Sequence, residues 1–222
     1  MQLYLLRHGQ SQNNVGKTSA HNVPMTELGH EQIRRATDAL ADRQFYISSR
    51  VPSGEKIRQF DALYCSPLDR ALQTATILHS KLNLTPYVHP DFSEVGFCWG
   101  EPNATLEQLQ SSYPCAVMDA SISNNGWAPV DSETEDEAYE RAGKVVHFLS
   151  ARHPAPNARV LVVSHGRFGS ILIGYLVGGV RPCGYSRYAQ NNGGISLVEI
   201  TNETIQLRFL NITAHLPGEL LT

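Results

Sequence analysis

Short apolar runs alternate with amphipathic stretches along most of this chain. Runs rich in Leu, Val, Ile and Tyr have the length of buried strands, and they occupy residues 2–6, 60–65, 86–89 and 159–164. Apolar positions recur at helical spacing between these runs, in residues 27–41, 68–82, 105–113 and 167–177. Another helix is predicted to open in the acidic stretch 131–137 and to end near residue 152. The last two apolar runs, 195–200 and 205–210, predict a hairpin.

Strands that alternate with helices are typical of an α/β fold with a parallel sheet. We therefore expect a three-layer sandwich, in which a mostly parallel central sheet carries helices on both faces. The closing hairpin would make the C-terminal edge of the sheet mixed. Residues 43–60 show little periodicity and are interpreted as a loop or a frayed helix extension, and residues 119–132 are interpreted as turns. Since no linker interrupts the pattern, we expect a single domain over residues 1–222.

Two of the predicted strands end in the same way, with a histidine followed by a glycine. The first strand runs into Arg7-His8-Gly9, and the strand at 159–164 runs into Ser164-His165-Gly166. Ligands of open α/β sheets bind beyond the carboxyl ends of the strands. The two histidines are therefore expected to face one another across a single pocket.

Four ordered motifs resemble those of the histidine phosphatase superfamily, also called phosphoglycerate mutase-like proteins. The resemblance begins at residue 3 and continues to about residue 200. Its motifs are Leu6-Arg7-His8-Gly9, Thr26-Glu27-Leu28-Gly29 with Gln32, the Ser66–Ala75 segment with Arg70, and Ser164-His165-Gly166. Members of this family carry a phosphate on the first histidine. The resemblance therefore implies a phosphomonoester hydrolase that acts through a phosphohistidine intermediate.

The chemistry of these side chains fits such a site. His8 is the candidate nucleophile, because a neutral imidazole nitrogen can attack phosphorus. Arg7 and Arg70 are candidates for a phosphate clamp, since guanidinium groups match phosphate oxygens with paired hydrogen bonds. His165 is expected to donate to a phosphate oxygen and to stabilise the transition state.

The remaining site residues come from the resemblance. Ser11 and Asn14 fall where the family has polar residues that bind phosphate, and simple loop turns are the alternative for both. Glu94 aligns with the family's general acid, with Glu101 as the alternative. The loop departs from the family's glycine pattern, because Cys98 stands where a glycine is expected.

Two further segments match the family in position but receive no catalytic role here. Glu133-Thr134 lies eight residues before Arg141 and is interpreted as a helix cap. Asn191-Asn192-Gly193-Gly194 precedes the hairpin and is interpreted as a turn.

Composition limits the partners. The 222 residues include 18 Lys and Arg against 21 Asp and Glu, which gives a net charge of −3. This balance gives no reason to expect nucleic acid or an acidic membrane surface as a partner. We expect a small phosphorylated substrate, no metal or cofactor and a cytoplasmic location, because neither a clustered ligand set nor a signal peptide is evident. A homodimer stays open as an alternative to a monomer.

Two other functions are weighed against hydrolysis. A phosphoglycerate mutase-type phosphotransferase is disfavoured, because residues 100–126 lack the basic, proline-rich insertion that such mutases carry. A non-catalytic phospholigand-binding protein would be indicated by a lost catalytic residue, and only the altered Glu94 loop points that way. Substrate selectivity is expected to come from residues 43–60 and 92–130.

Overall fold

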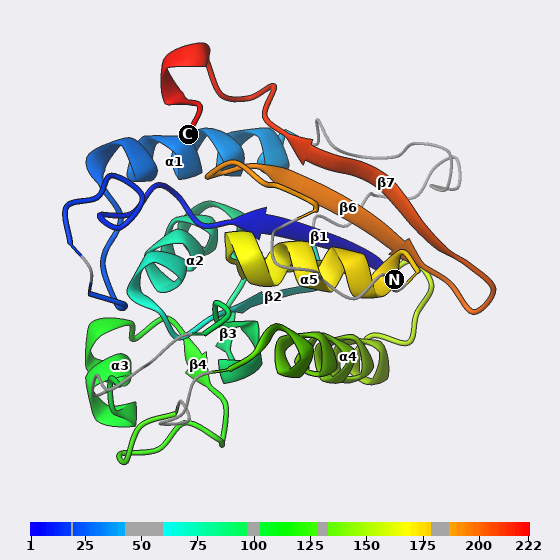
Figure 1. Cartoon of the computed structure of the whole chain (residues 1–222), viewed down its shortest axis with the longest axis horizontal. Coiled ribbons are helices and arrows are strands. Elements are labelled where there is room, and N and C mark those ends of the chain that lie inside the picture. The colour runs from blue at the N-terminus through cyan, green and yellow to red at the C-terminus, as the bar shows by residue number, and fades with distance from the viewer. Residues whose placement is uncertain (19, 43–59, 97–102, 128–132, 179–186) are drawn as a thin grey trace.

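In the computed structural model, all strands of the described residues belong to one central sheet (Figure 1). The structure describes residues 1–18, 20–42, 60–96, 103–127, 133–178 and 187–222. The order across the sheet is β4-β3-β2-β5-β1-β6-β7. Its strands are β1 (Gln2–Arg7), β2 (Ala62–Cys65), β3 (Pro86–Val88), β4 (Val117–Met118), β5 (Arg159–Ser164), β6 (Ile195–Ile200) and β7 (Ile205–Ile212).

Strand direction divides the sheet into a parallel part and an antiparallel edge. The pairs β3–β4, β2–β3, β2–β5 and β1–β5 are parallel, whereas β6 runs antiparallel to both β1 and β7. The central strands β1 and β5 are buried on both faces, so their sequences are nearly continuous apolar runs. The mostly parallel sheet and the mixed C-terminal edge are both confirmed.

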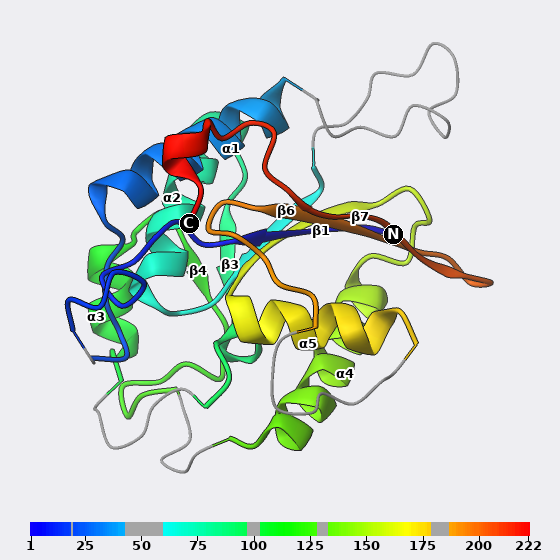
Figure 2. The same cartoon turned by 45° about the horizontal axis from the view of Figure 1, so that its top comes forward.

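Helices cover both faces of the sheet, as Figure 2 shows. They are α1 (Glu27–Ala41), α2 (Asp69–Leu82), α3 (Leu106–Ser112), α4 (Glu135–Arg152) and α5 (Gly166–Leu176), with short 3-10 helices at Pro90–Phe92 and Gly218–Leu220. Alternate residues of β1 point to opposite faces. Tyr4 and Leu6 pack in the cluster that contains α1 and α2, and Leu3 and Leu5 pack in the cluster that contains α4 and α5. The predicted three layers are therefore present.

Most helices begin at the residues that the sequence favours. Thr26 caps α1 by accepting a hydrogen bond from Gly29 N at 3.1 Å. Thr134 forms a capping box with Glu137 at the start of α4, which confirms the cap predicted there. The helix α5 has no cap from its own N-cap residue, His165. A side chain from another segment occupies its N-terminus, as described below.

The differences from the predicted elements are small and have a physical reason. The sequence does not predict the strand β4, because two residues at a sheet edge are too few to show a pattern. The predicted strand at 60–65 begins at Ala62, and Phe60 packs in the core just before it. The loop predicted at 43–60 lies almost entirely outside the described residues. No helix in the described part of the chain is long and apolar enough to cross a bilayer.

Candidate active site

The parallel pairing of β1 and β5 places the two predicted histidines together. Arg7 pairs with Ser164 in the register of these strands, so His8 and His165 follow at the same level of the sheet. Their ring centroids are 5.0 Å apart, and the two residues are 3% and 1% exposed. The pairing of β1 with β5 alone therefore brings the two histidine rings together.

His8 is held in one tautomer. Its Nδ1 lies 2.7 Å from the carbonyl oxygen of Gly9, and this oxygen can only accept, so Nδ1 carries the proton. The lone pair is therefore on Nε2, which accepts a hydrogen bond from Arg70 Nε at 3.2 Å. Burial lowers the pKa of His8 well below its ordinary value of 6.5, and the charges of Arg70 and Arg7 lower it further. His8 is thus neutral near neutral pH.

Two arginines lie beside this imidazole. Arg70 is 6% exposed at the start of α2, and its Nη1 donates to the carbonyl oxygen of His21 at 2.9 Å. Arg7 donates from Nη1 to the carbonyl oxygen of Gln190 at 2.6 Å. Burial lowers the pKa of Arg7, and the nearby charge of Glu94 opposes that shift. Backbone carbonyl oxygens thus help to fix both guanidinium groups beside His8.

Buried polar atoms without a partner mark the centre of the site. Within the described residues, Arg7 Nε and both ring nitrogens of His165 are buried and make no hydrogen bond. Such atoms usually find a partner, because an unpaired polar group loses its hydration without compensation. Burial lowers the pKa of His165 well below 6.5, followed by the charges of Arg70, His8, Arg7 and Arg141. A bound anion would provide acceptors and reverse the repulsion among these groups.

Ser11 and Asn14 fasten the loop that follows His8. The Asn14 Oδ1 accepts hydrogen bonds from Ser11 N and Ser11 Oγ, both at 2.9 Å. The same oxygen lies 3.3 Å from Asn192 Nδ2, which also donates to the carbonyl oxygen of His8 at 2.9 Å. The loop turn considered for these two residues is therefore present. Their predicted contact with phosphate stays a prediction.

The Thr26–Gln32 motif supports the same loop from the other side. Gln10 N donates to Gln32 Oε1 at 2.8 Å, and Thr26 N donates to the carbonyl oxygen of Gln10 at 2.8 Å. Gly29 is needed for this contact, because a Cβ there would lie 2.2 Å from the Gln10 carbonyl oxygen. This motif of the resemblance therefore shapes the loop after the nucleophile candidate.

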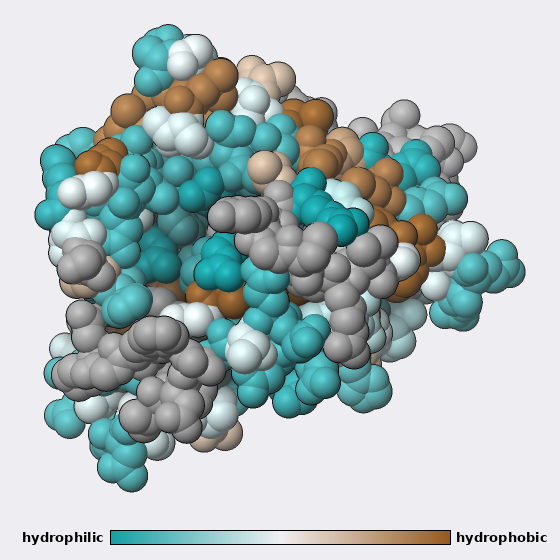
Figure 3. All heavy atoms as spheres, in the orientation of Figure 1, coloured by the Kyte–Doolittle hydropathy of each residue, from teal (hydrophilic) through white to brown (hydrophobic). Residues whose placement is uncertain are grey.

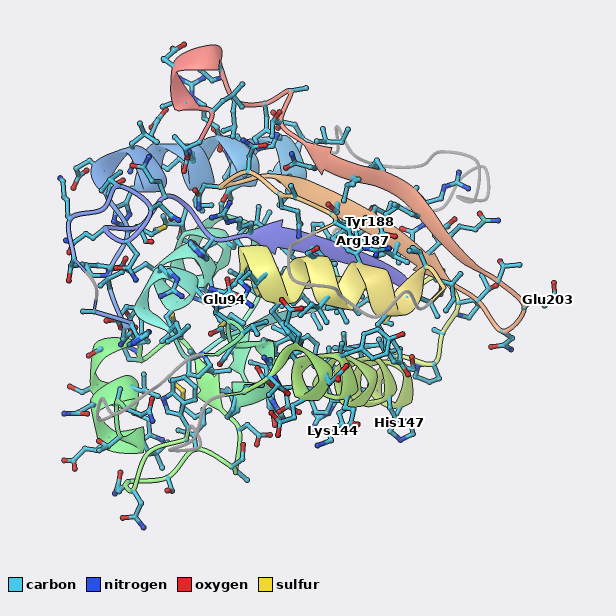
Figure 4. The ribbon with its side chains drawn as sticks, viewed as in Figure 1. Glu94, Lys144, His147, Arg187, Tyr188 and Glu203 are labelled. Carbon is cyan, nitrogen blue, oxygen red and sulfur yellow. The ribbon has the colours of Figure 1, made fainter. Side chains whose placement is uncertain are left out.

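Glu94 lies at the N-terminus of α5, next to the strand ends (Figure 4). Its Oε1 accepts from Phe168 N at 2.8 Å and from Val95 N at 2.9 Å, and its Oε2 accepts from Arg167 N at 3.2 Å. These bonds satisfy amide groups that the first turn of a helix leaves free. The alternative acid, Glu101, lies outside the described residues.

Figure 3 shows a hollow with hydrophilic walls on the face near the N-terminus of α5. In the described part of the chain, no group of three or more His, Cys, Asp or Glu side chains is arranged to hold a metal ion. The positive groups of the site are Arg7, Arg70 and, when protonated, His165. The arrangement suits an anion with several acceptor oxygens.

The turn at residues 191–194 contacts the site in a way that the sequence does not predict. The predicted turn at residues 191–194 is present, and it pairs with the β1 backbone through Gly193 N, which donates to the Arg7 carbonyl oxygen at 3.0 Å. Its second residue, Asn192, is 1% exposed and holds the His8 carbonyl as described above. An asparagine in a turn carries no local signal of such a long-range bond.

The model of a known protein family matches nearly the whole chain. The family model of the histidine phosphatase superfamily (branch 1) matches residues 3–53 and 51–213. The chain belongs to this superfamily. The resemblance carried by the four motifs is thus confirmed over nearly the whole sequence.

Individual histidine phosphatases are similar to the chain along its full length. It is 27% identical to PhoE, an uncharacterized phosphatase of Bacillus subtilis, over 96% of each chain. It is also 27% identical to the adenosylcobalamin/alpha-ribazole phosphatase of Escherichia coli, over 96% of this chain and 97% of that protein. A crystal structure of a putative alpha-ribazole-5'-P phosphatase from Escherichia coli has a TM-score of 0.66 and 26% identity, and the match covers 96% and 97% of the two chains.

Proposed function

We propose that the protein hydrolyses phosphomonoesters through a phosphohistidine on His8. One observation carries this proposal: buried polar atoms of Arg7 and His165 without hydrogen-bond partners among the residues that the structure describes lie beside a neutral His8. The Nε2 atom of His8 carries no proton, so its lone pair can act as a nucleophile. A phosphoryl group in this position would satisfy the donors and face the nucleophile.

In the first step, His8 Nε2 attacks phosphorus and the bond from phosphorus to the ester oxygen breaks. Glu94, in its protonated form, gives its proton to the departing oxygen, and an alcohol leaves. In the second step, Glu94 takes a proton from water, whose oxygen attacks the phosphohistidine. The nitrogen–phosphorus bond breaks, inorganic phosphate is released and Glu94 is protonated again.

The charged groups around phosphorus stabilise the transition state. Arg7 and Arg70 approach from two different elements, the end of β1 and the start of α2. His165 would become a donor once a phosphate dianion offsets the burial and repulsion that now lower its pKa. Ser11 and Asn14 are proposed to contribute neutral hydrogen bonds.

The direct test is to trap the intermediate. The enzyme is mixed with a substrate labelled in the phosphate, quenched in alkali and searched for acid-labile phosphate on His8. We expect His8→Ala to form no phosphoenzyme and to lose activity by at least about 1000-fold. The matched control is His147→Ala, because this histidine lies exposed on α4 (Figure 4). Full activity in His8→Ala would contradict the proposal.

Transfer to a second hydroxyl is the other candidate reaction of this family. The two reactions share the first step and differ in what accepts the phosphate from His8. Assays with and without a bisphosphoglycerate primer separate them, and we expect release of inorganic phosphate that does not depend on the primer. A panel of phosphomonoesters, with α-ribazole phosphate included because of the named relative, would identify the preferred substrate.

A further inference from the structure

A partly buried ion pair that has no assigned role lies close to the segment that carries Glu94. Arg141 of α4 pairs with Glu133, with Nε to Oε1 and Nη2 to Oε2 both at 2.6 Å. The side chains are only 13% and 17% exposed. A bidentate pair of this kind fixes the plane of the guanidinium group. Thr134 provides the helix cap predicted for this segment, so Glu133 is free for another task.

The third nitrogen of Arg141 holds the backbone that leads to Glu94. Its Nη1 donates to the carbonyl oxygen of Asp91 at 2.6 Å and to that of Ser93 at 3.0 Å. The segment leaves the short helix Pro90–Phe92 here and enters no other regular element before Glu94. The guanidinium group therefore provides hydrogen bonds that secondary structure does not provide at this place.

The same guanidinium group also contacts the residue that holds the Glu94 carboxylate. Its carbon lies 3.9 Å from the centre of the Phe168 ring. The amide of Phe168 donates to Glu94 Oε1 at 2.8 Å. Arg141 thus joins the two segments that determine where this carboxylate lies, one carrying Glu94 and the other binding it. All three of its nitrogens have protein partners, so it differs from Arg7, whose Nε has none.

We propose that Arg141, oriented by Glu133, is a positioning residue that keeps the Glu94 carboxyl group at the leaving-group oxygen. This inference rests on the proposed role of Glu94 as general acid. Proton transfer is sensitive to distance, and a displacement of about 1 Å can cost about 100-fold in rate. Loss of the pair is therefore expected to weaken acid catalysis while leaving the phosphate pocket in place.

The leaving group of the substrate separates this role from a general structural one. 4-Nitrophenolate departs without a proton, whereas the alkoxide of an alkyl phosphate needs one. The value of kcat/KM includes only steps up to the release of this group, so it reports acid catalysis directly. A misplaced acid lowers kcat/KM for the alkyl phosphate alone, and a damaged pocket lowers it for both substrates.

The experiment compares four variants on 4-nitrophenyl phosphate and on glycerol phosphate. Glu133→Gln and Arg141→Lys test the pair, Glu94→Gln tests the acid, and Glu140→Gln is the matched control on an exposed position of α4. We expect Glu94→Gln to lose about 100-fold or more with glycerol phosphate and little with 4-nitrophenyl phosphate. Glu133→Gln and Arg141→Lys are expected to show the same preference, with a loss of about tenfold or more. Glu140→Gln should change neither.

The double variant Glu94→Gln/Glu133→Gln completes the test, with melting temperatures recorded for every variant. If Glu133 acts through Glu94, the double variant loses no more than Glu94→Gln alone. Equal losses on both substrates in Glu133→Gln, or additive losses in the double variant, would overturn the positioning role while the acid role stands. Equal losses on both substrates in Glu94→Gln would instead remove the acid role, and this inference with it.

Discussion

His8 and His165 lie side by side, and the proposed reaction needs them in different protonation states. His8 must keep its Nε2 lone pair, and its Nδ1 proton is secured by the Gly9 carbonyl oxygen. His165 has no such carbonyl partner, and both its ring nitrogens lack a hydrogen bond within the described ranges. The same burial lowers the pKa of both histidines, which suits the proposed nucleophile His8 and means that His165 needs a bound anion to gain its proton.

The first prediction concerns the proton that accompanies anion binding. Sulfate is a dianion with no titrating proton near neutrality, so any proton that is taken up when it binds must protonate the protein. Because burial and neighbouring cations lower the pKa of His165 when the site is empty, sulfate should raise it and cause uptake of up to about one proton at pH 7. Calorimetric titration in two buffers of different ionisation enthalpy measures this uptake. It should vanish in His165→Gln, and equal heats in both buffers for the unaltered protein would contradict it.

Among the elements, the contact between the loop after β1 and the first turn of α1 leaves little room for change. A Cβ on Gly29 would lie 2.2 Å from the carbonyl oxygen of Gln10, and a Cβ on Gly9 would lie 2.4 Å from that of Gly29. These neighbours are backbone atoms that are themselves hydrogen-bonded. The loop therefore depends on glycine at both positions.

A second prediction tests this contact with Gly29→Ala. The added methyl group must displace the backbone of Gln10, and overpacking of this kind costs about 1–3 kcal/mol of unfolding free energy. Urea unfolding should show this loss, and phosphatase activity should fall with it, because His8 is two residues from the displaced atom. Gly218→Ala is the control, since a Cβ there meets no atom within 4 Å. Equal stability of the two variants would show that the loop can move without cost.

Local motifs made the elements and the central side chains predictable. His8 and His165 end buried apolar runs, and the pairing of parallel strands then brings them together. The roles of Asn192 and Arg141 could not be predicted, because their bonds join segments 184 and 48–50 residues apart. Such contacts depend on tertiary packing, which leaves no periodic pattern in a single sequence.

At the scale of the whole molecule, the histidines link the site to stability. Burial lowers the pKa of His8 and His165 in the folded chain, and those of His153 and His215 are lowered in the same direction. The unfolded chain therefore binds more protons than the folded one below about pH 6.5. The stabilising effect of these neutral imidazoles is complete above that pH and is lost as the pH falls.

The third prediction follows from this loss of stability at low pH. Below pH 6.5 His8 and His165 should each reduce the unfolding free energy by about 1.4 kcal/mol per pH unit, until the folded-state pKa is reached. Urea unfolding at pH 7.5, 6.0 and 5.0 measures the slope. A double variant, His8→Asn with His165→Asn, should show a smaller slope than the unaltered protein. Parallel slopes would mean that the two histidines do not remain neutral in the folded state.

The position of β1 in the sheet also has a consequence for biosynthesis. Gln2 pairs with Arg159 on one side and with Glu199 on the other. The strand that carries the nucleophile candidate thus leaves the ribosome more than 150 residues before either of its neighbours. Contacts so distant along the chain form slowly, and an apolar strand without partners is prone to aggregate in the interval. A nascent chain of this protein should therefore need shielding of β1 until β5 and β6 have been translated.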